Sequence, residues 1–526
     1  MAFSYHAPRH IDGNYSVFPK DISEWERTEI DAQPGRGHEL MEIAGREVAC
    51  HVLGQYPTCR EILVFCGLGN NGGDGFVAAR YLKRCGLDVH LFVFDETISK
   101  TADAKSMFEH VQKLPRIVLH TASDAARILE WENRSGLLVI DGIFGTGYRP
   151  SHNPLMSMVY QMIAKLSCPV VSIDIPSGID AATGYRSKRE DDNPPRALTA
   201  TSTVTFSSPK MGHFLGEGPS HTGELWCVDI GLRPWPSDRT RALILSDEYC
   251  QEAFWQNFKR AFDAHKGRCG HVAVIGGQNA MRGASCLAGK AALRAGCGLV
   301  TLGTRADIWA PDELMVRPIC AENGHLNQNA IDEIFAKSSC ILVGPGLGRD
   351  ELARDILLKC LAFGGRLILD ADALWALPDL NMRFKSQEVF VTPHPAEAAR
   401  LCGVTVSEIL HDPIGYAGKI VEKYGVTAIL KSHATVIASQ RGNVMRYAVC
   451  PHPNPAIATA GAGDVLAGIL SGLVAQTRGG AVTKWFDSFE MACMAVNCHS
   501  KAGRNAAKSK GNGVCAGDII DGIDIG

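Results

Sequence analysis

The sequence lacks several features that would point to a membrane, to secretion or to nucleic acid. It has no uninterrupted apolar run of about 20 residues, the length a helix needs to cross a bilayer. Residues 1–20 include Arg9, Asp12 and Pro19 and no apolar stretch typical of a signal peptide. A formal net charge of −3 over 526 residues gives no electrostatic case for nucleic acid or an anionic membrane. We therefore expect a cytoplasmic protein whose partners are small molecules.

Paired metal-binding cysteines, short repeats and low-complexity tracts are also missing. The 18 cysteines are scattered singly, without a Cys-x-x-Cys pair that would indicate a zinc or redox site. We interpret them as reduced residues, mostly buried. The 46% hydrophobic and 21% charged content is ordinary for a globular protein, and the length predicts two large domains or about three smaller ones.

What is present is an alternation of short apolar runs with helix-like stretches, the pattern of parallel sheets covered by helices. The fold class expected is α/β throughout. Between Asp229 and Asp247 the periodicity is lost and two prolines occur, which favours a boundary giving domains 1–235 and 236–526. The predicted strands are 61–66, 87–94, 137–141, 169–174, 203–206, 225–229, 271–275, 299–302, 340–343, 366–369, 389–391, 426–430 and 435–438. The predicted helices are 74–84, 283–295, 464–475 and 489–507.

The loop after the first of these strands contains Gly67-Leu-Gly69-Asn-Asn-Gly72, which satisfies the G-x-G-x-x-G pattern of dinucleotide-binding loops. Asp95, after the next strand, strengthens that interpretation. Against it, Asp74 stands where the helix start would receive a pyrophosphate, and a carboxylate there repels phosphate. The loop therefore suits a polar ligand or a cation better than a plain pyrophosphate.

Two further strand ends in the first half carry acids among glycines, at Asp141-Gly-Ile-Phe-Gly145-Thr146-Gly147 and at Asp174-Ile-Pro-Ser177-Gly-Ile-Asp180. In a parallel sheet such ends share the carboxyl edge, where ligands bind. Each acid alone could equally be a turn or helix cap. Together, oxygen donors from Asn71, Asp141 and Ser177 could hold a hard cation.

These three motifs resemble the NAD(P)H-hydrate epimerase domain, over roughly residues 20–232. That family interconverts the R and S epimers at C6 of hydrated NAD(P)H, and the resemblance implies a Rossmann-like three-layer domain. It implies a potassium ion held by Asn71, Asp141 and Ser177, with Asp141 as candidate acid/base group or as a cation ligand that orients the substrate. The substrate contacts it implies are Asn70, Asn71, Gly72, Gly73, Asp74, Gly145, Thr146, Gly147 and Asp174.

The second half contains Ala460-Gly461-Ala462-Gly463-Asp464 directly before an apolar helical stretch. The glycines allow a tight turn, and the unpaired N–H groups at a helix start favour phosphate. An acid in such a place suits the removal of a proton from a hydroxyl that attacks the phosphate. In isolation Asp464 could instead cap the helix.

Four other segments of the second half have a similar character. Lys266 lies on a glycine turn and could meet phosphate, although it could equally be a solvated surface side chain. The glycines of Gly344-Pro-Gly346-Leu-Gly348 require a special backbone or a close ligand. Asp370-Ala-Asp372 follows a strand, and His394 lies between two prolines that would hold it rigidly.

Taken together, these segments resemble the ribokinase-like fold, and more closely the ADP- or ATP-dependent NAD(P)H-hydrate dehydratase. The resemblance spans roughly residues 262–475. It implies hydrate contacts from Ala284, Gly346, His394 and Asp464, with Asp464 as the catalytic base and Mg²⁺ accompanying the nucleotide. The nucleotide contacts it implies are Lys431, Ser432, His433, Ala434, Thr435 and Gly463.

The resemblance implies a bifunctional repair enzyme that epimerises hydrated NAD(P)H and dehydrates the S form at the expense of ADP or ATP. A homo-oligomer is expected, since ribokinase-like folds commonly assemble. Ser432 departs from the family, which usually has glycine there and so a closer approach to the nucleotide. A small-metabolite kinase of the ribokinase-like class, or a binding or scaffold protein without activity, remains the alternative.

Overall fold

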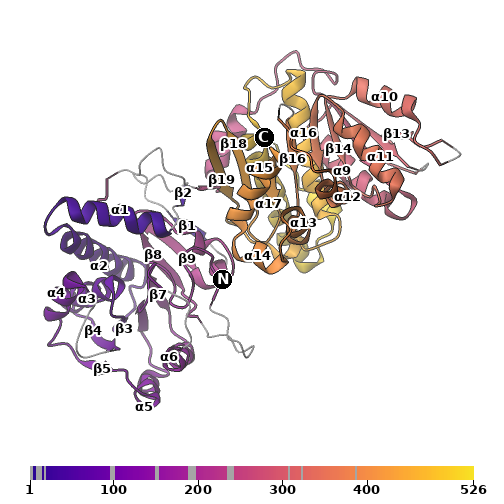
Figure 1. Cartoon of the computed structure of the whole chain (residues 1–526). Coiled ribbons are helices and arrows are strands. Elements are labelled where there is room, and N and C mark those ends of the chain that lie inside the picture. Colours follow the sequence, from indigo (N-terminus) through magenta and orange to yellow (C-terminus); the bar gives the residue numbers. More distant parts are fainter. Residues whose placement is uncertain are drawn as a thin grey trace. The chain divides into compact units, whose positions relative to one another are not determined.

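The computed structural model describes residues 4–6, 15–16, 19–94, 101–148, 153–186, 197–233, 242–305, 308–321, 324–385 and 388–525. The chain divides into two compact units, Met1–Arg241 and Ala242–Gly526. The boundary expected between residues 235 and 236 lies outside the described residues, as does Asp95. Both units are α/β, as the sequence predicted (Figure 1).

The first unit is built on a wholly parallel sheet with strand order β1-β9-β8-β7-β6-β3-β4-β5. From β3 the chain adds β4 and β5 on one side and then returns to add β6, β7 and β8 on the other. The direction of winding therefore reverses between β3 and β6, and a crevice opens at the carboxyl ends of these strands. The strands are β1 (Ser4–His6), β2 (Tyr15–Ser16), β3 (Glu61–Cys66), β4 (Asp88–Val93), β5 (Arg116–Val118), β6 (Leu137–Gly142), β7 (Val170–Ile173), β8 (Ser202–Phe206) and β9 (Glu224–Val228).

Helices cover both faces of this sheet. Successive residues of a strand point to opposite sides, and because both sides of these strands are apolar, both must be buried. Ile62 and Val64 of β3 pack with α2, α3 and α4 on one face, whereas Leu63 and Phe65 pack with α5 and α6 on the other (Figure 1). The result is three layers. The helices are α1 (Pro19–Ala32), α2 (Arg36–Gln55), α3 (Asn70–Arg84), α4 (Ala102–Glu109), α5 (Ala122–Ala126), α6 (Pro154–Lys165) and α7 (Gly218–Thr222), with 3₁₀ turns η1 (Arg127–Trp131) and η2 (Met211–His213).

The second unit contains a mixed sheet in the order β13-β12-β11-β14-β15-β16-β17-β18-β19-β10, parallel except where β18 pairs with β17 and β19. Its winding reverses between β11 and β14. The strands are β10 (Ala242–Ile244), β11 (His271–Gly276), β12 (Leu299–Thr304), β13 (Met315–Pro318), β14 (Cys340–Val343), β15 (Arg366–Leu369), β16 (Val389–Val391), β17 (Thr427–Leu430), β18 (Val436–Arg441) and β19 (Val444–Val449).

Two helices of the second unit, α9 and α16, pack closely against each other and against the centre of the sheet. A Cβ atom at Gly468 or Gly472 of α16 would lie 2.2 Å or 2.5 Å from a carbonyl oxygen of α9, so glycine is required for this approach. The helices are α8 (Asp247–Ala253), α9 (Arg282–Arg294), α10 (Gln328–Lys337), α11 (Glu351–Leu361), α12 (Asp372–Ala376), α13 (Pro395–Cys402), α14 (Val406–His411), α15 (Pro413–Tyr424), α16 (Ala462–Gly479), α17 (Ser488–Lys510) and α18 (Ala516–Asp521). The 3₁₀ turns are η3 (Trp255–Asn257), η4 (Asn279–Met281), η5 (Leu377–Leu380), η6 (Pro455–Ile457) and η7 (Gly511–Gly513).

Each predicted strand is present, with its ends within two residues of the prediction except for the carboxyl end of β18. The prediction for α3 was wrong at its start. The helix begins at Asn70 rather than Asp74, so the asparagines that were expected in a loop form its first turn.

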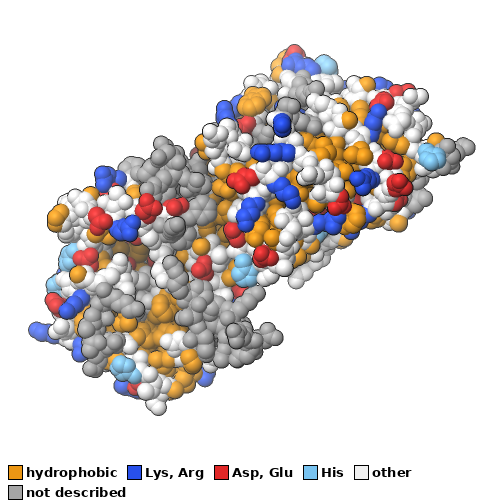
Figure 2. All heavy atoms as spheres, in the orientation of Figure 1, with side chains coloured by type: hydrophobic (Ala, Val, Ile, Leu, Met, Phe, Trp, Pro, Cys, Tyr) orange, Lys and Arg blue, Asp and Glu red, His pale blue; other side chains and the backbone are white. Residues whose placement is uncertain are grey.

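No helix among the described residues combines the length and apolarity needed to cross a membrane. All 18 cysteines are free, and most are buried. Acidic and basic side chains are interspersed over the face seen in Figure 2, in keeping with the small net charge.

Candidate active sites in the two units

The first unit has a cavity of ≈ 870 Å³ at the carboxyl ends of β3 and β6, where the winding of the sheet reverses. Phe65 and Asp141 are register partners on these strands, so the loops that follow them emerge side by side. The cavity brings together most of the substrate contacts predicted for this half. Those that line it are Asn70, Asn71, Asp74, Gly145, Thr146, Gly147 and Asp174.

Gly72 and Gly73 are not among the lining residues, because they face the interior of the unit. A Cβ atom at Gly72 would lie 1.9 Å from the carbonyl oxygen of Gly67, and one at Gly73 would lie 2.5 Å from the sulfur of Met41. These two glycines let α3 lie close to the preceding loop and to α2. They therefore affect the shape of the cavity without lining it.

Asp141 is completely buried, and its carboxylate accepts four hydrogen bonds. Ser177 donates to it from Oγ at 2.5 Å and from its N–H at 2.8 Å, Ser172 donates from Oγ at 2.9 Å, and Ile143 donates from its N–H at 3.3 Å. Burial raises the pKa of Asp141, although these hydrogen bonds oppose the shift. Neither Asp141 nor Ser177 lines the cavity, so Asp141 lies behind the wall that a substrate would touch.

The predicted cation ligands supply only oxygen donors, from an amide, a carboxylate and a hydroxyl. Asn71 is buried, and its Nδ2 has no hydrogen-bond partner among the described residues. Its Oδ1 lies beside Gly145, where a Cβ atom would approach it to 3.1 Å. A set of ligands made only of oxygen atoms fits a hard cation such as K⁺.

Asp174 joins the cavity to a buried lysine that the sequence analysis did not identify. Its Oδ1 accepts from Lys210 Nζ at 2.5 Å and from Thr205 Oγ1 at 3.0 Å, and Lys210 is 1% exposed. Burial alone would raise the pKa of Asp174, but the charge and hydrogen bond of Lys210 hold it below its usual range. A lone lysine after a strand gives no sequence signal of this pairing.

Glu26 of α1 also lines the cavity and was missed. It lies outside every motif, and only the packing of α1 against the cavity brings it there. Burial, with a smaller contribution from Asp174, raises the pKa of Glu26 to about 7, although Lys210 opposes the shift.

In the second unit, Asp464 lies in the first turn of α16, at the start that the glycines open. The residue that precedes the helix is Gly461, with φ +88°, and no side chain caps the helix. Asp464 is therefore not a helix cap. Burial, reinforced by the carboxylate of Asp370, raises the pKa of Asp464 to about 7, although Lys431 acts in the opposite direction.

Lys431 is a charged neighbour of Asp464 at the carboxyl edge of the sheet. Lys431 Nζ donates to Asp370 Oδ1 at 2.8 Å, and a Cβ atom at Gly463 would lie 3.2 Å from the same Nζ. Asp370 also accepts from Thr392 Oγ1 at 2.7 Å. A half-buried cation is thus placed beside the glycine at the start of α16, where an anionic group would be stabilised.

A second cavity, of ≈ 460 Å³, lies next to this helix start. Four of the predicted nucleotide contacts after β17 line it, as do Gly463 and His394. Its apolar wall was not predicted from the sequence. The predicted nucleotide contacts in the lining are Lys431, Ser432, His433, Thr435 and Gly463, and the wall includes Cys450, Pro453, Pro455, Ile457, Ala458, Leu466 and Val496.

His394 has a structural role as well as a place in the cavity lining. Its Nδ1 accepts from the N–H groups of Ala396 and Glu397 at 3.1 Å and 3.4 Å, and Glu397 Oε2 accepts from the His394 N–H at 2.8 Å. This reciprocal cap begins α13. Nδ1 is therefore occupied as an acceptor, and Nε2, which lies 3.4 Å from Glu397 Oε1, is the ring nitrogen that could face a ligand.

Ala284 and Gly346, the other predicted hydrate contacts, lie in neighbouring elements at the point where β11 and β14 diverge. Gly346 accepts from the Gln278 N–H at 2.8 Å, and a Cβ atom at Gly346 would lie 2.4 Å from the carbonyl oxygen of Met281. Ala284 follows in the first turn of α9. Lys266, by contrast, is exposed and precedes β11, so it lies at the amino edge, opposite the edge that carries these residues.

Ser432, the departure from the family, stabilises its own turn. Its Oγ donates to the Ala434 carbonyl at 2.8 Å and accepts from the Ala434 N–H at 3.2 Å. It is not among the described residues that have positive φ, so the backbone there does not require glycine.

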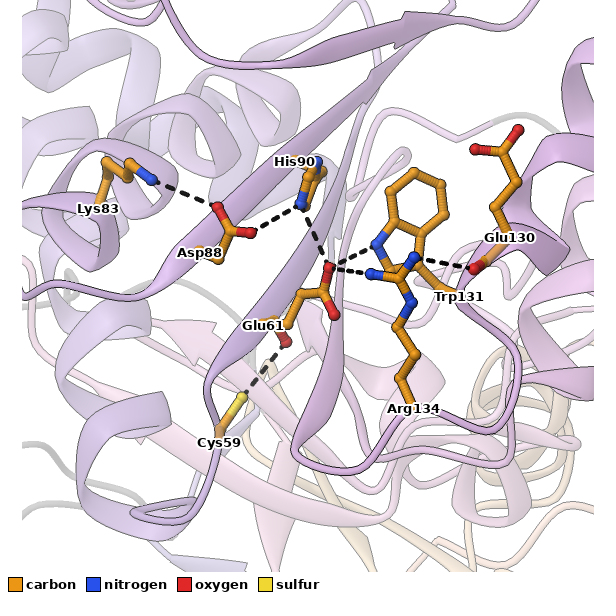
Figure 3. A network of polar contacts seen from close by, with 8 residues as sticks. All are labelled: Cys59, Glu61, Lys83, Asp88, His90, Glu130, Trp131 and Arg134. Carbon is orange, nitrogen blue, oxygen red and sulfur yellow. Dashed lines mark hydrogen bonds and ion pairs between the residues drawn. The ribbon is translucent and has the colours of Figure 1, made fainter.

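A third group of titratable side chains, Glu61, Asp88 and His90, lies at the amino edge of the first sheet (Figure 3). Its carboxylates are already paired. Glu61 Oε1 accepts from Arg134 Nη1 at 2.7 Å and from Trp131 Nε1 at 2.8 Å, and Lys83 Nζ lies 3.4 Å from Asp88. We interpret this network as a structural one that links β3, β4 and η1, since it lies at the edge of the sheet opposite the cavity.

Comparison with known families assigns a family model to each unit. Residues 37–212 match the model described as YjeF-related protein N-terminus, and residues 272–524 match the model described as NAD(P)H-hydrate dehydratase.

Curated relatives match almost the whole chain. The bifunctional NAD(P)H-hydrate repair enzyme Nnr of Moorella thermoacetica is 34% identical over 92% of this chain and 91% of its own, and that of Escherichia coli is 32% identical over 96% and 92%. Among solved structures, a ribokinase-like superfamily protein from Enterococcus faecalis is 28% identical, covers 55% of this chain and 95% of its own, and has a TM-score of 0.45. With full-length relatives above 30% identity, the chain belongs to the family of bifunctional NAD(P)H-hydrate repair enzymes.

Proposed function

We propose that the two cavities carry the two reactions of this family, one in each unit. The first unit epimerises the R and S forms of hydrated NAD(P)H, and the second dehydrates the S form to NAD(P)H with ADP or ATP. The observation that supports this most strongly is Asp464, with a pKa near neutrality, at an uncapped helix start beside Lys431.

In the second unit, Asp464 takes the proton from the C6 hydroxyl of the hydrate as that oxygen attacks the terminal phosphoryl group. The N–H groups at the start of α16 and the charge of Lys431 stabilise the phosphoryl group during its transfer. The N1 lone pair then expels phosphate from C6, loss of the proton from C5 forms the C5–C6 double bond, and NAD(P)H is restored. The apolar wall of the smaller cavity suits the base of the nucleotide.

Mg²⁺ is expected to enter with the nucleotide and to neutralise its phosphates. The nearest carboxylates are already engaged, Asp370 by Lys431 and Asp372 by Arg349 Nε at 2.8 Å and the Gly348 N–H at 2.9 Å. We therefore assign the ion to the phosphates rather than to a cage of protein carboxylates.

In the first unit, we assign K⁺ to Asn71, Asp141 and Ser177. A cation there would supply positive charge beside Asn71, which lines the cavity, and so would hold a polar group of the substrate. Asp141 is buried behind the cavity lining, and its carboxylate accepts four hydrogen bonds. We therefore assign it a positioning role as cation ligand rather than the acid/base role.

The test is to supply purified R and S epimers separately, each with ADP or ATP, and to follow the recovery of absorbance at 340 nm. Both epimers should yield NAD(P)H and free phosphate. A stable phosphorylated product would favour a small-metabolite kinase instead, and no recovery with either epimer or nucleotide would favour a binding or scaffold protein. The same assay decides between ADP and ATP and between NADHX and NADPHX.

We also propose that the enzyme works in the cytoplasm, since all its cysteines are free thiols, and that it assembles as a homo-oligomer.

A further inference from the structure

The cavity of the first unit contains three acidic side chains, from three different elements. Glu26 comes from α1, Asp74 from α3 and Asp174 from the end of β7, and all three line the space. The charged groups that interact with Glu26 are Lys210, Asp174 and Asp74. Arg27, the next residue of α1, lies in the same wall.

One of these acids, Asp174, is ionised and paired with a buried lysine. Asp174 forms the buried ion pair with Lys210 and accepts a further hydrogen bond from Thr205, so its negative charge is compensated. Asp174 also has φ +67°, a backbone conformation that aspartate tolerates better than most residues. It is the ionised member of the group.

Among the described residues that line the cavity, no buried cation is left for the other two acids. With one lysine committed to Asp174, the ionisation of both Glu26 and Asp74 would place uncompensated charge against the cavity wall, which is costly away from water. Burial accordingly raises the pKa of Asp74, and like charges on Asp174 and Glu26 add to the shift. Asp74 is 8% exposed, whereas Glu26 is only half-buried and more accessible to a ligand.

Resting on the epimerase function proposed above, we infer that Glu26 is the catalytic acid of the first site and gives its proton to the departing C6 hydroxyl of the hydrate. Asp174, held ionised by Lys210, is its counterpart and accepts a proton from the water that returns.

The C6–O bond breaks with its electrons on oxygen, the proton of Glu26 joins that oxygen, and water departs while the N1 lone pair forms an N1=C6 double bond. Water then adds to the opposite face of C6, the double-bond electrons return to N1, and the proton lost by the water goes to Asp174. Asp174 then releases that proton to water and Glu26 takes one from water, so the cycle closes and no oxidant or reductant is needed.

The test uses the full chain with Glu26→Gln, which keeps the shape and removes the transferable proton. Interconversion of purified epimers is followed chromatographically without nucleotide, so that the second unit is idle, and the uncatalysed rate is subtracted. We expect the epimerisation kcat to fall by roughly 10²-fold, the lower range for loss of a general acid, with KM within about threefold. Dehydration of the pure S epimer should be unchanged.

The matched control is Glu24→Gln, two residues away on the same helix and exposed, which should epimerise at the wild-type rate. Glu26→Asp keeps a carboxyl group and should retain a falling alkaline limb in the pH profile of kcat, which Glu26→Gln should abolish. Thermal unfolding of each variant checks that the first unit is folded.

Two results would overturn the inference. One is a folded Glu26→Gln variant with wild-type epimerisation, and the other is an unchanged alkaline limb in that variant. If the wild-type chain itself fails to interconvert the epimers, the proposed function fails instead, so the two failures are distinguishable.

Discussion

Asp141 and Asp464 belong to similar motifs, each a carboxylate among glycines at the carboxyl edge of a largely parallel sheet, yet their surroundings differ. Asp141 is completely buried and has four hydrogen-bond donors. Asp464 is half-buried at an uncapped helix start, with Asp370 and Lys431 as charged neighbours. Several hydrogen-bond donors fix the position of a carboxylate and oppose a rise in its pKa. Partial burial beside a second carboxylate instead raises the pKa, so that such a group can exchange a proton near neutral pH.

The contrast between Asp141 and Asp464 is tested most directly by removing the proposed base of the second site. Asp464→Asn should lower the rate of dehydration by roughly 10²- to 10⁴-fold, because an amide cannot take the proton of the attacking hydroxyl. Nucleotide binding should persist, since Lys431 and the cavity wall are untouched, and calorimetric titration with ADP measures this. Epimerisation in the same variant is the internal control, and wild-type turnover would contradict the role of Asp464.

The corresponding change in the first unit should act mainly on structure. In Asp141→Asn, one side-chain oxygen becomes an N–H₂ group, which faces either the Ser177 Oγ and Ile143 N–H donors or the Ser172 Oγ and Ser177 N–H donors. A buried mismatch of this kind costs about 1–3 kcal/mol, so we expect a lower unfolding temperature for the first unit together with weaker K⁺ dependence of epimerisation. Dehydration of the S epimer should be unaffected. If Asp141→Asn instead lost most of its epimerisation at full stability, and the residual rate kept its K⁺ dependence, Asp141 would be the acid/base group after all.

The elements were predictable from the sequence to a greater extent than the sites. Fully buried strands such as β3 and β14 have continuous apolar runs, and Gly461 and Gly463 signal the start of α16 without further information. Glu26 and Lys210 could not be predicted, because their roles arise only when α1 and the segment after β8 pack around the same cavity. Asp141 was predicted as a functional residue, but the number of donors around it depends on register between β6, β7 and the following loop.

The smallest effect expected, and the one that joins the two sites, is their opposite dependence on pH. Asp464 must be ionised to act as a base, so dehydration of the S epimer should rise with pH through about 7 and fall by up to about tenfold per unit below it. Glu26 must be protonated to act as an acid, so epimerisation should fall as pH rises through about 7. Measuring kcat for each reaction on the same chain between pH 5.5 and 8.5, a range of about one and a half units on either side of both pKa values, therefore tests both assignments at once. Parallel profiles would show that one of the two carboxyl groups has been given the wrong role, and Glu26→Gln and Asp464→Asn then identify which.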